Sequence, residues 1–204
     1  APVTVEDVEQ ALAVFSEDYL GARIRVPTLY ERADVRSYVA LSQVHRGADL
    51  LLVPDLGDLG ELALAAAEGL ADREESVERE AFEQLDRSAV EKVVAAVQRH
   101  GVADLQVVYF PGVDLYTHVA EQALEEQLRY IRDVVDPGVG AILGAYRRAG
   151  ALEQTYVVFV SDHGHVPVLD DERHALGLEG DDEPPALLER MGFRLRPFAL
   201  ELDD

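Results

Sequence analysis

The sequence predicts an α/β fold with a mostly parallel central sheet. Its 204 residues, of which 48% are hydrophobic, are enough to bury a core, and this composition is that of a globular chain. Two runs, LQVVYF at 105–110 and TYVVFV at 155–160, are rich in β-branched and aromatic residues. Such runs are typical of strands that are buried on both faces. Helical patterns lie between the strands, as in parallel sheets with crossover helices.

The part of the chain before residue 75 predicts two helices and one strand. Capping residues and apolar runs set the boundaries. A helix is expected at 5–20, with Thr4 as N-cap and Gly21 as the residue that ends it. A short helix is expected at 27–33 and a strand at 35–42. The apolar stretch at 49–53 is too short to assign, and an Ala- and Leu-rich stretch follows at 59–70.

The middle of the chain predicts two long helical segments, each followed by a buried strand. Apolar residues recur at steps of three and four between 76 and 100, and Gly101 ends that helix. A second helix is predicted at 119–135, where Pro137-Gly138 kinks or breaks it, with a continuation at 139–149.

The alternation of helical and strand patterns becomes weaker after Ser161. An acidic loop is expected at 170–183, a short helix at 184–191 and a short strand at 193–196. Because no repeat or linker marks a boundary, we expect residues 1–204 to form a single α/β domain.

The net charge of −22 limits the classes of partner. Such a surface repels nucleic-acid polymers and anionic membranes. An acidic protein that acts on phosphate esters needs local positive charge, which bound metal ions can provide. The absence of cysteine excludes disulfides and thiolate ligands.

Targeting signals are not visible in the sequence. Residues 1–6 lack the basic and apolar regions of a signal peptide, and no apolar run is long enough to span a membrane. These features favour the cytoplasm, although a leader removed earlier would leave no trace.

Asp114 and His118 follow the first buried strand. They are four positions apart, so they share a face if this segment is helical. A carboxylate and an imidazole on one face can bind one divalent ion. The alternative is an Asp that caps a helix and a surface His one turn later.

Asp162 and His163 follow the second buried strand directly. At a bend both side chains can reach one centre, and Gly164 permits such a bend. The alternative is an ordinary turn, in which Asp and Gly are common.

Together the two pairs predict a two-metal site. The carboxyl ends of parallel strands meet at one edge of a sheet, where functional residues gather. Oxygen and nitrogen ligands without sulfur suit zinc, with manganese as the alternative. Two such ions can clamp the attacking and leaving oxygens of a phosphoryl displacement.

These motifs resemble the type I phosphodiesterase and nucleotide pyrophosphatase group of the alkaline phosphatase superfamily. The resemblance rests on Y-x-PG-x-D-x-x-x-H at 109–118 and on SDHG at 161–164, and it covers about residues 26–168. It implies a mostly parallel sheet with helices on both faces. It also implies that Asp114 and His118 bind one metal, that Asp162 and His163 bind the second, and that the substrate is a small phosphate ester or nucleotide.

The resemblance also implies parts that the sequence does not display. These are an Asp at the end of a first strand, a Thr or Ser nucleophile behind it, and a distal His. Thr4 and Thr28 are explained as helix-start residues, and His165 and His174 follow SDHG too closely to be the distal ligand. We therefore expect this chain to be the central portion of a larger alkaline phosphatase-like domain, with its catalytic nucleophile unidentified.

Other functions remain open at the level of sequence. One is a degenerate relative that binds a metal or another ligand without catalysis, as an α/β module. Another is a different branch of the superfamily, such as a phosphomonoesterase, a phosphoglycerate-mutase-like enzyme or a phosphonate hydrolase.

Overall fold

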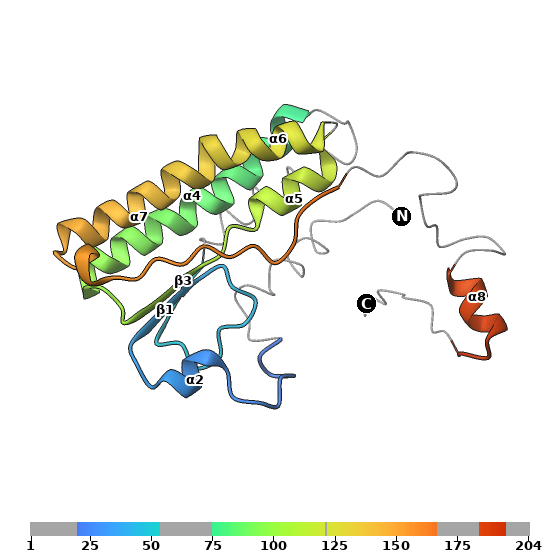
Figure 1. Ribbon diagram of the computed structural model, residues 1–204, viewed down its shortest axis with the longest axis horizontal. Helices are drawn as coiled ribbons and strands as arrows, with labels where there is room; N and C mark the ends of the chain where they lie inside the picture. The colour runs from blue at the N-terminus through green and yellow to red at the C-terminus, as the bar shows by residue number, and fades with distance from the viewer. Residues whose placement is uncertain (1–19, 54–74, 121, 167–183, 195–204) are drawn as a thin grey trace, which may run out of the picture. The chain divides into compact units, whose positions relative to one another are not determined.

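The structure is a computed structural model that describes residues 20–53, 75–120, 122–166 and 184–194 (Figure 1). The chain divides into two compact units, Ala1–Asp162 and His163–Asp204. The helix predicted at 5–20, the stretch at 59–70 and the acidic loop at 170–183 lie in or largely in the undescribed parts. Each unit is considered by itself.

The first unit contains a parallel sheet, as the sequence predicts. Within the described residues its strands are β1 (Ser37–Ala40), β2 (Leu50–Leu52) and β3 (Leu105–Val108), in the order β2-β1-β3. Val39 is opposite Leu51 on one side and Val107 on the other. The stretch at 49–53, which could not be assigned from sequence, therefore forms a strand.

The strands differ in burial. All four residues of β1 are buried, because a strand lies on each side of it. Each residue of β3 is only half-buried. The prediction that 105–110 is buried on both faces is wrong in this respect, because β3 pairs with β1 on one side and lies at the edge of the described sheet.

Helix α4 (Glu75–His100) covers the sheet and supplies much of the core. It packs against β1 and β2, and α7 (Asp136–Arg148) runs along α4 (Figure 1). The apolar side chains of α4 recur at the predicted steps and pack against the strands. The buried core residues between α4 and the sheet are Tyr38, Ala40, Leu41, Leu52, Leu85, Ala89, Val93, Ala96 and Ala103.

The helical run after β3 is more divided than its sequence suggests. It consists of α5 (Gly112–Val119), α6 (Ala123–Tyr130), the π-helical turn η1 (Ile131–Val135) and α7. A kink or a break was predicted at Pro137-Gly138, and the helix continues through Pro137 without a break. Pro137 lacks an N–H and its ring crowds the preceding turn, and the wider π-helical turn directly before it relieves this conflict.

Helix α2 (Leu29–Ala33) is fixed by its N-cap. The Thr28 hydroxyl accepts a hydrogen bond from the Glu31 N–H at 3.2 Å, and the Thr28 N–H donates to the Glu31 carboxylate at 2.8 Å. The same hydroxyl donates to the Arg46 carbonyl at 2.6 Å. Thr28 is therefore a helix-start residue, as predicted, and it ties α2 to the loop after β1.

The segment at 155–160 differs most from its prediction. It follows the 3-10 turn η2 (Leu152–Gln154) and belongs to no strand of the sheet. Its apolar side chains face solvent, with Tyr156 98% and Val160 85% exposed. The prediction of a buried strand is wrong here because burial requires a paired edge and a covering layer, and the described residues supply neither to this segment.

The second unit contains α8 (Pro184–Arg190), which confirms the short helix predicted at 184–191. Phe193 and Arg194 are not in regular structure, and residues 195–196 of the predicted strand lie outside the description. Across the described ranges, the search for a helix both long and apolar enough for a membrane crossing finds none.

Candidate metal centre

Helix α5 carries the first predicted ligand pair. It begins at Gly112, four residues after β3 ends, so it stands at the carboxyl edge of the parallel sheet. Asp114 lies in its first turn and is half-buried. His118 lies one turn further along the same helix, so the backbone positions of the pair share a face. The helix that the Asp114/His118 spacing requires is therefore present.

The start of α5 is held by a side chain from another helix. Its N-cap residue, Pro111, makes no side-chain cap hydrogen bond. Instead the Gly112 N–H donates to Asp86 Oδ1 on α4 at 3.3 Å. The Tyr130 hydroxyl at the end of α6 lies 3.0 Å from Asp86 Oδ2 and 2.7 Å from the Phe82 carbonyl oxygen.

Asp86 is fully buried, and this changes its acidity. Burial raises the pKa of the Asp86 carboxyl to about 7, against the lowering effect of its bonds to Tyr130 and Gly112. Sequence reasoning missed this residue. The available signal was its position on the apolar stripe of α4, four residues after Phe82 and three before Ala89.

The carboxylates of Asp114 and Asp162 both affect the pKa of the Tyr109 phenol. Burial raises the pKa of Tyr109, and the negative charges of Asp162, Asp114 and Asp86 raise it further. Because such an effect requires proximity, the carboxylates at the ends of the two predicted motifs lie in the same region as Tyr109. All of these residues belong to the first unit.

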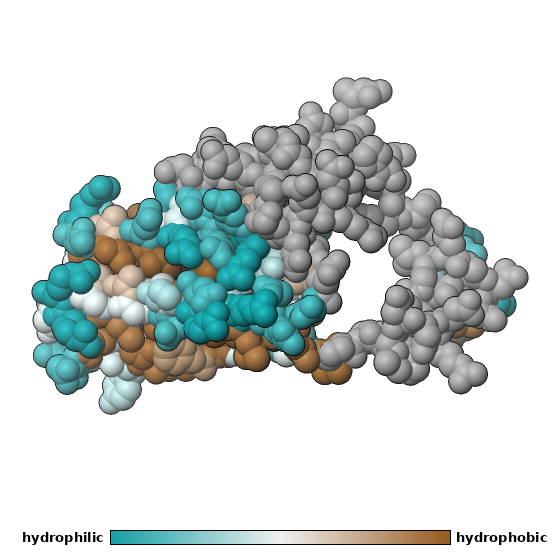
Figure 2. All heavy atoms as spheres, turned by 90° about the horizontal axis from the view of Figure 1, so that it is seen from above, coloured by the Kyte–Doolittle hydropathy of each residue, from teal (hydrophilic) through white to brown (hydrophobic). Residues whose placement is uncertain are grey.

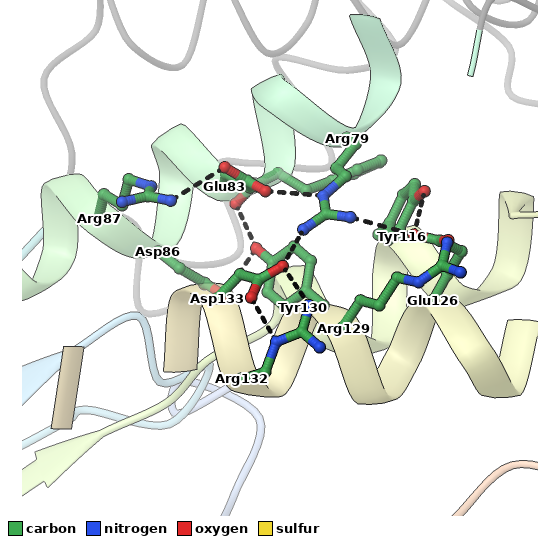
Figure 3. Close-up of polar contacts among 11 residues, drawn as sticks. Arg79, Glu83, Asp86, Arg87, Tyr116, Glu126, Arg129, Tyr130, Arg132 and Asp133 are labelled. Carbon is green, nitrogen blue, oxygen red and sulfur yellow. Dashed lines mark hydrogen bonds and ion pairs between the residues drawn. The ribbon is translucent and has the colours of Figure 1, made fainter. Parts of the chain in front are cut away.

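A partly buried ionic network connects the helices that follow β3 to α4 (Figure 3). The Arg79 guanidinium on α4 contacts Glu83 at 2.7 Å, Glu126 of α6 at 3.1 Å and Asp133 of η1 at 3.1 Å. The Tyr116 hydroxyl on α5 donates to Glu126 at 3.2 Å. Arg79 thus links α4 to α6 and to η1.

Tyr116 does not line a substrate groove. It is 1% exposed, and its ring packs 5.9 Å from that of Tyr130. Tyr116 therefore belongs to the helical core, into which its i+4 spacing from Gly112 directs the side chain. Tyr109 is half-buried against the core between α4 and the sheet.

The second motif ends the first unit and begins the second. Asp162 is exposed and closes the first unit, and His163 is the first residue of the second unit. In that unit the rings of His163 and His165 are adjacent, with centroids 5.5 Å apart. His163 Nδ1 lies 3.2 Å from the Gly164 carbonyl oxygen.

Comparison with family models gives a match over residues 25–180 to the model described as type I phosphodiesterase / nucleotide pyrophosphatase. The matched range contains both predicted ligand motifs. The chain belongs to this phosphodiesterase family. Comparison with curated proteins and with solved structures finds no match.

Membership explains the architecture described above. The family consists of metal-dependent phosphodiesterase hydrolases, and its members act on phosphate esters. A small parallel sheet packed against helices is consistent with part of an alkaline phosphatase-like core. The resemblance stated from the two sequence motifs is thereby confirmed.

Proposed function

We propose that this chain supplies two halves of a two-metal site for hydrolysis of a phosphodiester or nucleotide pyrophosphate. In this proposal Asp114 and His118 hold one divalent ion, and Asp162 and His163 hold the other. Residues 1–204 would form the central portion of a larger phosphodiesterase domain. The Thr or Ser nucleophile is not assigned to any residue of the chain.

The observation that carries the proposal is the position of α5. A helix that starts just after a parallel strand places Asp114 and His118 one turn apart at the carboxyl edge of the sheet. This is the edge at which α/β proteins bind ligands. The influence of both Asp114 and Asp162 on Tyr109 supports the view that the two motifs serve one region.

The donor set fits the expected metals. One carboxylate and one imidazole for each ion suit zinc, and manganese is the alternative. When bound, the ions would polarise the phosphoryl oxygens and stabilise the attacking and leaving oxygens. Asp114 and Asp162 would supply negative charge, and His118 and His163 would bind as neutral imidazoles. Because a ligating imidazole nitrogen cannot carry a proton, uptake should weaken as the pH falls.

Metal titration of the whole chain tests the ligand assignment. We expect zinc or manganese to bind, and Asp114→Asn and Asp162→Asn each to weaken binding by about tenfold or more. Calorimetry gives the affinity and elemental analysis gives the ions bound per chain. A wild-type chain that takes up neither metal would contradict the proposal.

A matched control separates ligation from general loss of negative charge. Asp136 lies in the first turn of α7, as Asp114 does in α5, and is exposed. Asp136→Asn should leave metal affinity unchanged. Equal losses in Asp114→Asn and Asp136→Asn would mean that the acidic surface attracts cations without a specific site.

Turnover distinguishes an enzyme from a binding relative. We expect the protein with its native flanking sequence to hydrolyse a chromogenic p-nitrophenyl phosphodiester, and Asp162→Asn to abolish this activity. Metal uptake without turnover would indicate a non-catalytic binding protein. Faster turnover of phosphomonoesters or phosphonates than of diesters would assign the chain to another branch of the superfamily.

A further inference from the structure

We propose that Asp86 is a positioning residue that holds the first turn of α5, and with it Asp114, by a hydrogen-bond relay through Gly112 and Tyr130. The inference rests on the proposed function, because it assigns Asp86 to the metal half-site formed by Asp114 and His118. Asp86 lies on α4, and its described hydrogen bonds are to Gly112 and Tyr130, neither of which is a predicted ligand. It would act through the backbone of α5.

The need for such a residue follows from how α5 begins. The first N–H groups of a helix have no partner within it and are usually capped by a side chain at the N-cap. Pro111 occupies that position and makes no such bond. Asp86 Oδ1 accepts from the Gly112 N–H instead, so a neighbouring helix caps α5.

Gly112 fits this arrangement because it lacks a side chain. A Cβ at residue 112 would overlap the Tyr130 hydroxyl, and would lie 2.7 Å from Asp86 Oδ2 and 2.8 Å from the Phe82 carbonyl oxygen. The backbone of α5 therefore approaches α4 and α6 as closely as it can. Any larger residue must displace either the start of α5 or the groups of α4 and α6 that hold it, and Asp114 is two residues away.

The hydrogen bonds of Asp86 and Tyr130 form a relay that has a donor for every acceptor only if Asp86 is protonated (Figure 3). The Tyr130 hydroxyl has one proton but faces two acceptors, the Phe82 carbonyl at 2.7 Å and Asp86 Oδ2 at 3.0 Å. If Asp86 carries a proton, it donates to the Tyr130 oxygen, and Tyr130 donates to Phe82. Gly112 still donates to Asp86 Oδ1. Each contact then has one proton, and no buried acceptor in the relay is left unmatched.

The surroundings favour this neutral form. Asp86 and Tyr130 are each 0% exposed. The ionisable groups that act on the relay are Glu83 and Arg87 from α4, which influence Tyr130, and Tyr109 after β3, which is influenced by Asp86. Among the described interactions of Asp86, its two hydrogen bonds are to neutral groups. Burial without a cationic partner raises the pKa of this carboxyl.

Two substitutions of Asp86 separate positioning from packing. Asp86→Asn keeps a carbonyl oxygen for Gly112 and an N–H donor for Tyr130, so it should bind zinc as wild type does. Asp86→Ala removes both contacts and should weaken zinc binding by about tenfold or more, as loss of outer-shell partners does. Wild-type zinc affinity in folded Asp86→Ala would overturn the proposal.

Gly112→Ala provides a second variant that leaves Asp86 intact. It should weaken zinc binding by the same mechanism, because the added methyl group displaces the start of α5. Leu85→Ala is the control for lost stability, since Leu85 is buried on α4 against the sheet. Equal effects of Leu85→Ala and Asp86→Ala on zinc affinity would mean that Asp86 acts only through stability.

Amide hydrogen exchange of the metal-free chain gives a readout that does not depend on ligation. Exchange at Gly112, Val113 and Asp114 should accelerate in Asp86→Ala and Gly112→Ala, but not in Asp86→Asn or Leu85→Ala. If exchange follows this pattern while wild type binds no metal, the proposed function fails and the positioning role stands. If wild type binds metal while exchange in α5 is unchanged in every variant, the positioning role fails.

Discussion

At the scale of single residues, the Asp86 carboxyl lies in an environment that is shielded from water. It is completely buried between α4, α5 and α6, and its described hydrogen-bond partners are the Gly112 N–H and the Tyr130 hydroxyl. A charged carboxylate in such a place is destabilised relative to the neutral acid. The pKa of about 7 therefore links the stability of the helical layer to pH.

The sign of this link follows from proton counting. In the unfolded chain Asp86 has the ordinary pKa of 3.8, and in the folded chain its pKa is about 7. Between these values the folded state holds a proton that the unfolded state has lost, so stability falls as pH rises. The loss is complete above about pH 7 and amounts to about 4 kcal/mol.

Asp86→Asn cannot ionise and should lack this loss. The unfolding free energy of Asp86→Asn minus that of wild type should increase between pH 4 and pH 7, by up to about 4 kcal/mol, and then level off. Urea unfolding at a series of pH values measures the difference. A difference that is constant across this range would show that Asp86 is ionised in the folded protein throughout.

Residue identities yield candidate ligands only where the chemistry is local. The Asp114/His118 spacing and the SDHG motif are visible in the sequence because each is a short pattern. Asp86 was not predicted, because its role depends on the contact between α4 and α5 across 26 positions. The burial of Tyr116 was not predicted for a related reason, since the residue type of an aromatic beside a motif does not show whether it faces solvent or a core.

At the scale of elements, the Arg79 guanidinium joins its own helix, α4, to three other helical segments. It pairs with Glu83 within α4, Glu126 of α6 and Asp133 of η1, and it lies over the Tyr116 ring of α5 at 5.9 Å. The Glu126 side chain is only 8% exposed. Glu126 also pairs with Arg129 of α6, so removing Arg79 would leave this buried carboxylate with one cationic partner instead of two, and breaking a buried ion pair from one side is costly.

Arg79→Gln should therefore destabilise the helical layer by about 2–3 kcal/mol, somewhat less than for a fully buried pair because Arg79 is partly exposed. Arg87→Gln is the control. Arg87 pairs with the same Glu83 at 3.1 Å but its side chain is 49% exposed, so its loss should cost less than about 0.5 kcal/mol. Chemical denaturation measures both. Similar losses in the two variants would refute the joining role of Arg79.

Helices and strands whose signal lies entirely within their own segment of sequence were predicted well. Helix α4 and strands β1 and β3 follow from periodicity and residue type, which a segment carries by itself. The segment at 155–160 has the composition of a strand but no partner edge in the described structure. Likewise, the π-helical turn before Pro137 depends on how the helix accommodates a ring, which residue type alone does not specify.

At the scale of the whole molecule, the charge of the chain opposes its compaction. Forty acidic residues against 18 basic ones give a net charge of −22. Hydrophilic side chains cover much of the described surface visible in Figure 2, with apolar patches between them. Like charges that are exposed to solvent repel one another through water, and salt screens this repulsion.

Raising sodium chloride from about 0.05 to 0.5 M should therefore increase the melting temperature of the metal-free chain by a few degrees. The ion pairs around Arg79 are partly shielded from solvent and should weaken less than the surface repulsion does. A melting temperature that falls with added salt would indicate that ion pairs outweigh repulsion. Differential scanning calorimetry at several salt concentrations provides the measurement.

The order of strands in the sheet has a consequence for how the protein forms. Tyr38 of β1 is opposite Leu50 on one side and Gln106 on the other, so its neighbours are 12 and 68 positions away. The short loop to β2 closes readily, whereas pairing with β3 must bring together distant segments and enclose α4. During synthesis β1 and β2 emerge close together, but the edge of β1 that pairs with β3 has no partner strand until β3 has left the ribosome. The carboxyl edge of the sheet, and the metal centre proposed there, would thus be assembled late.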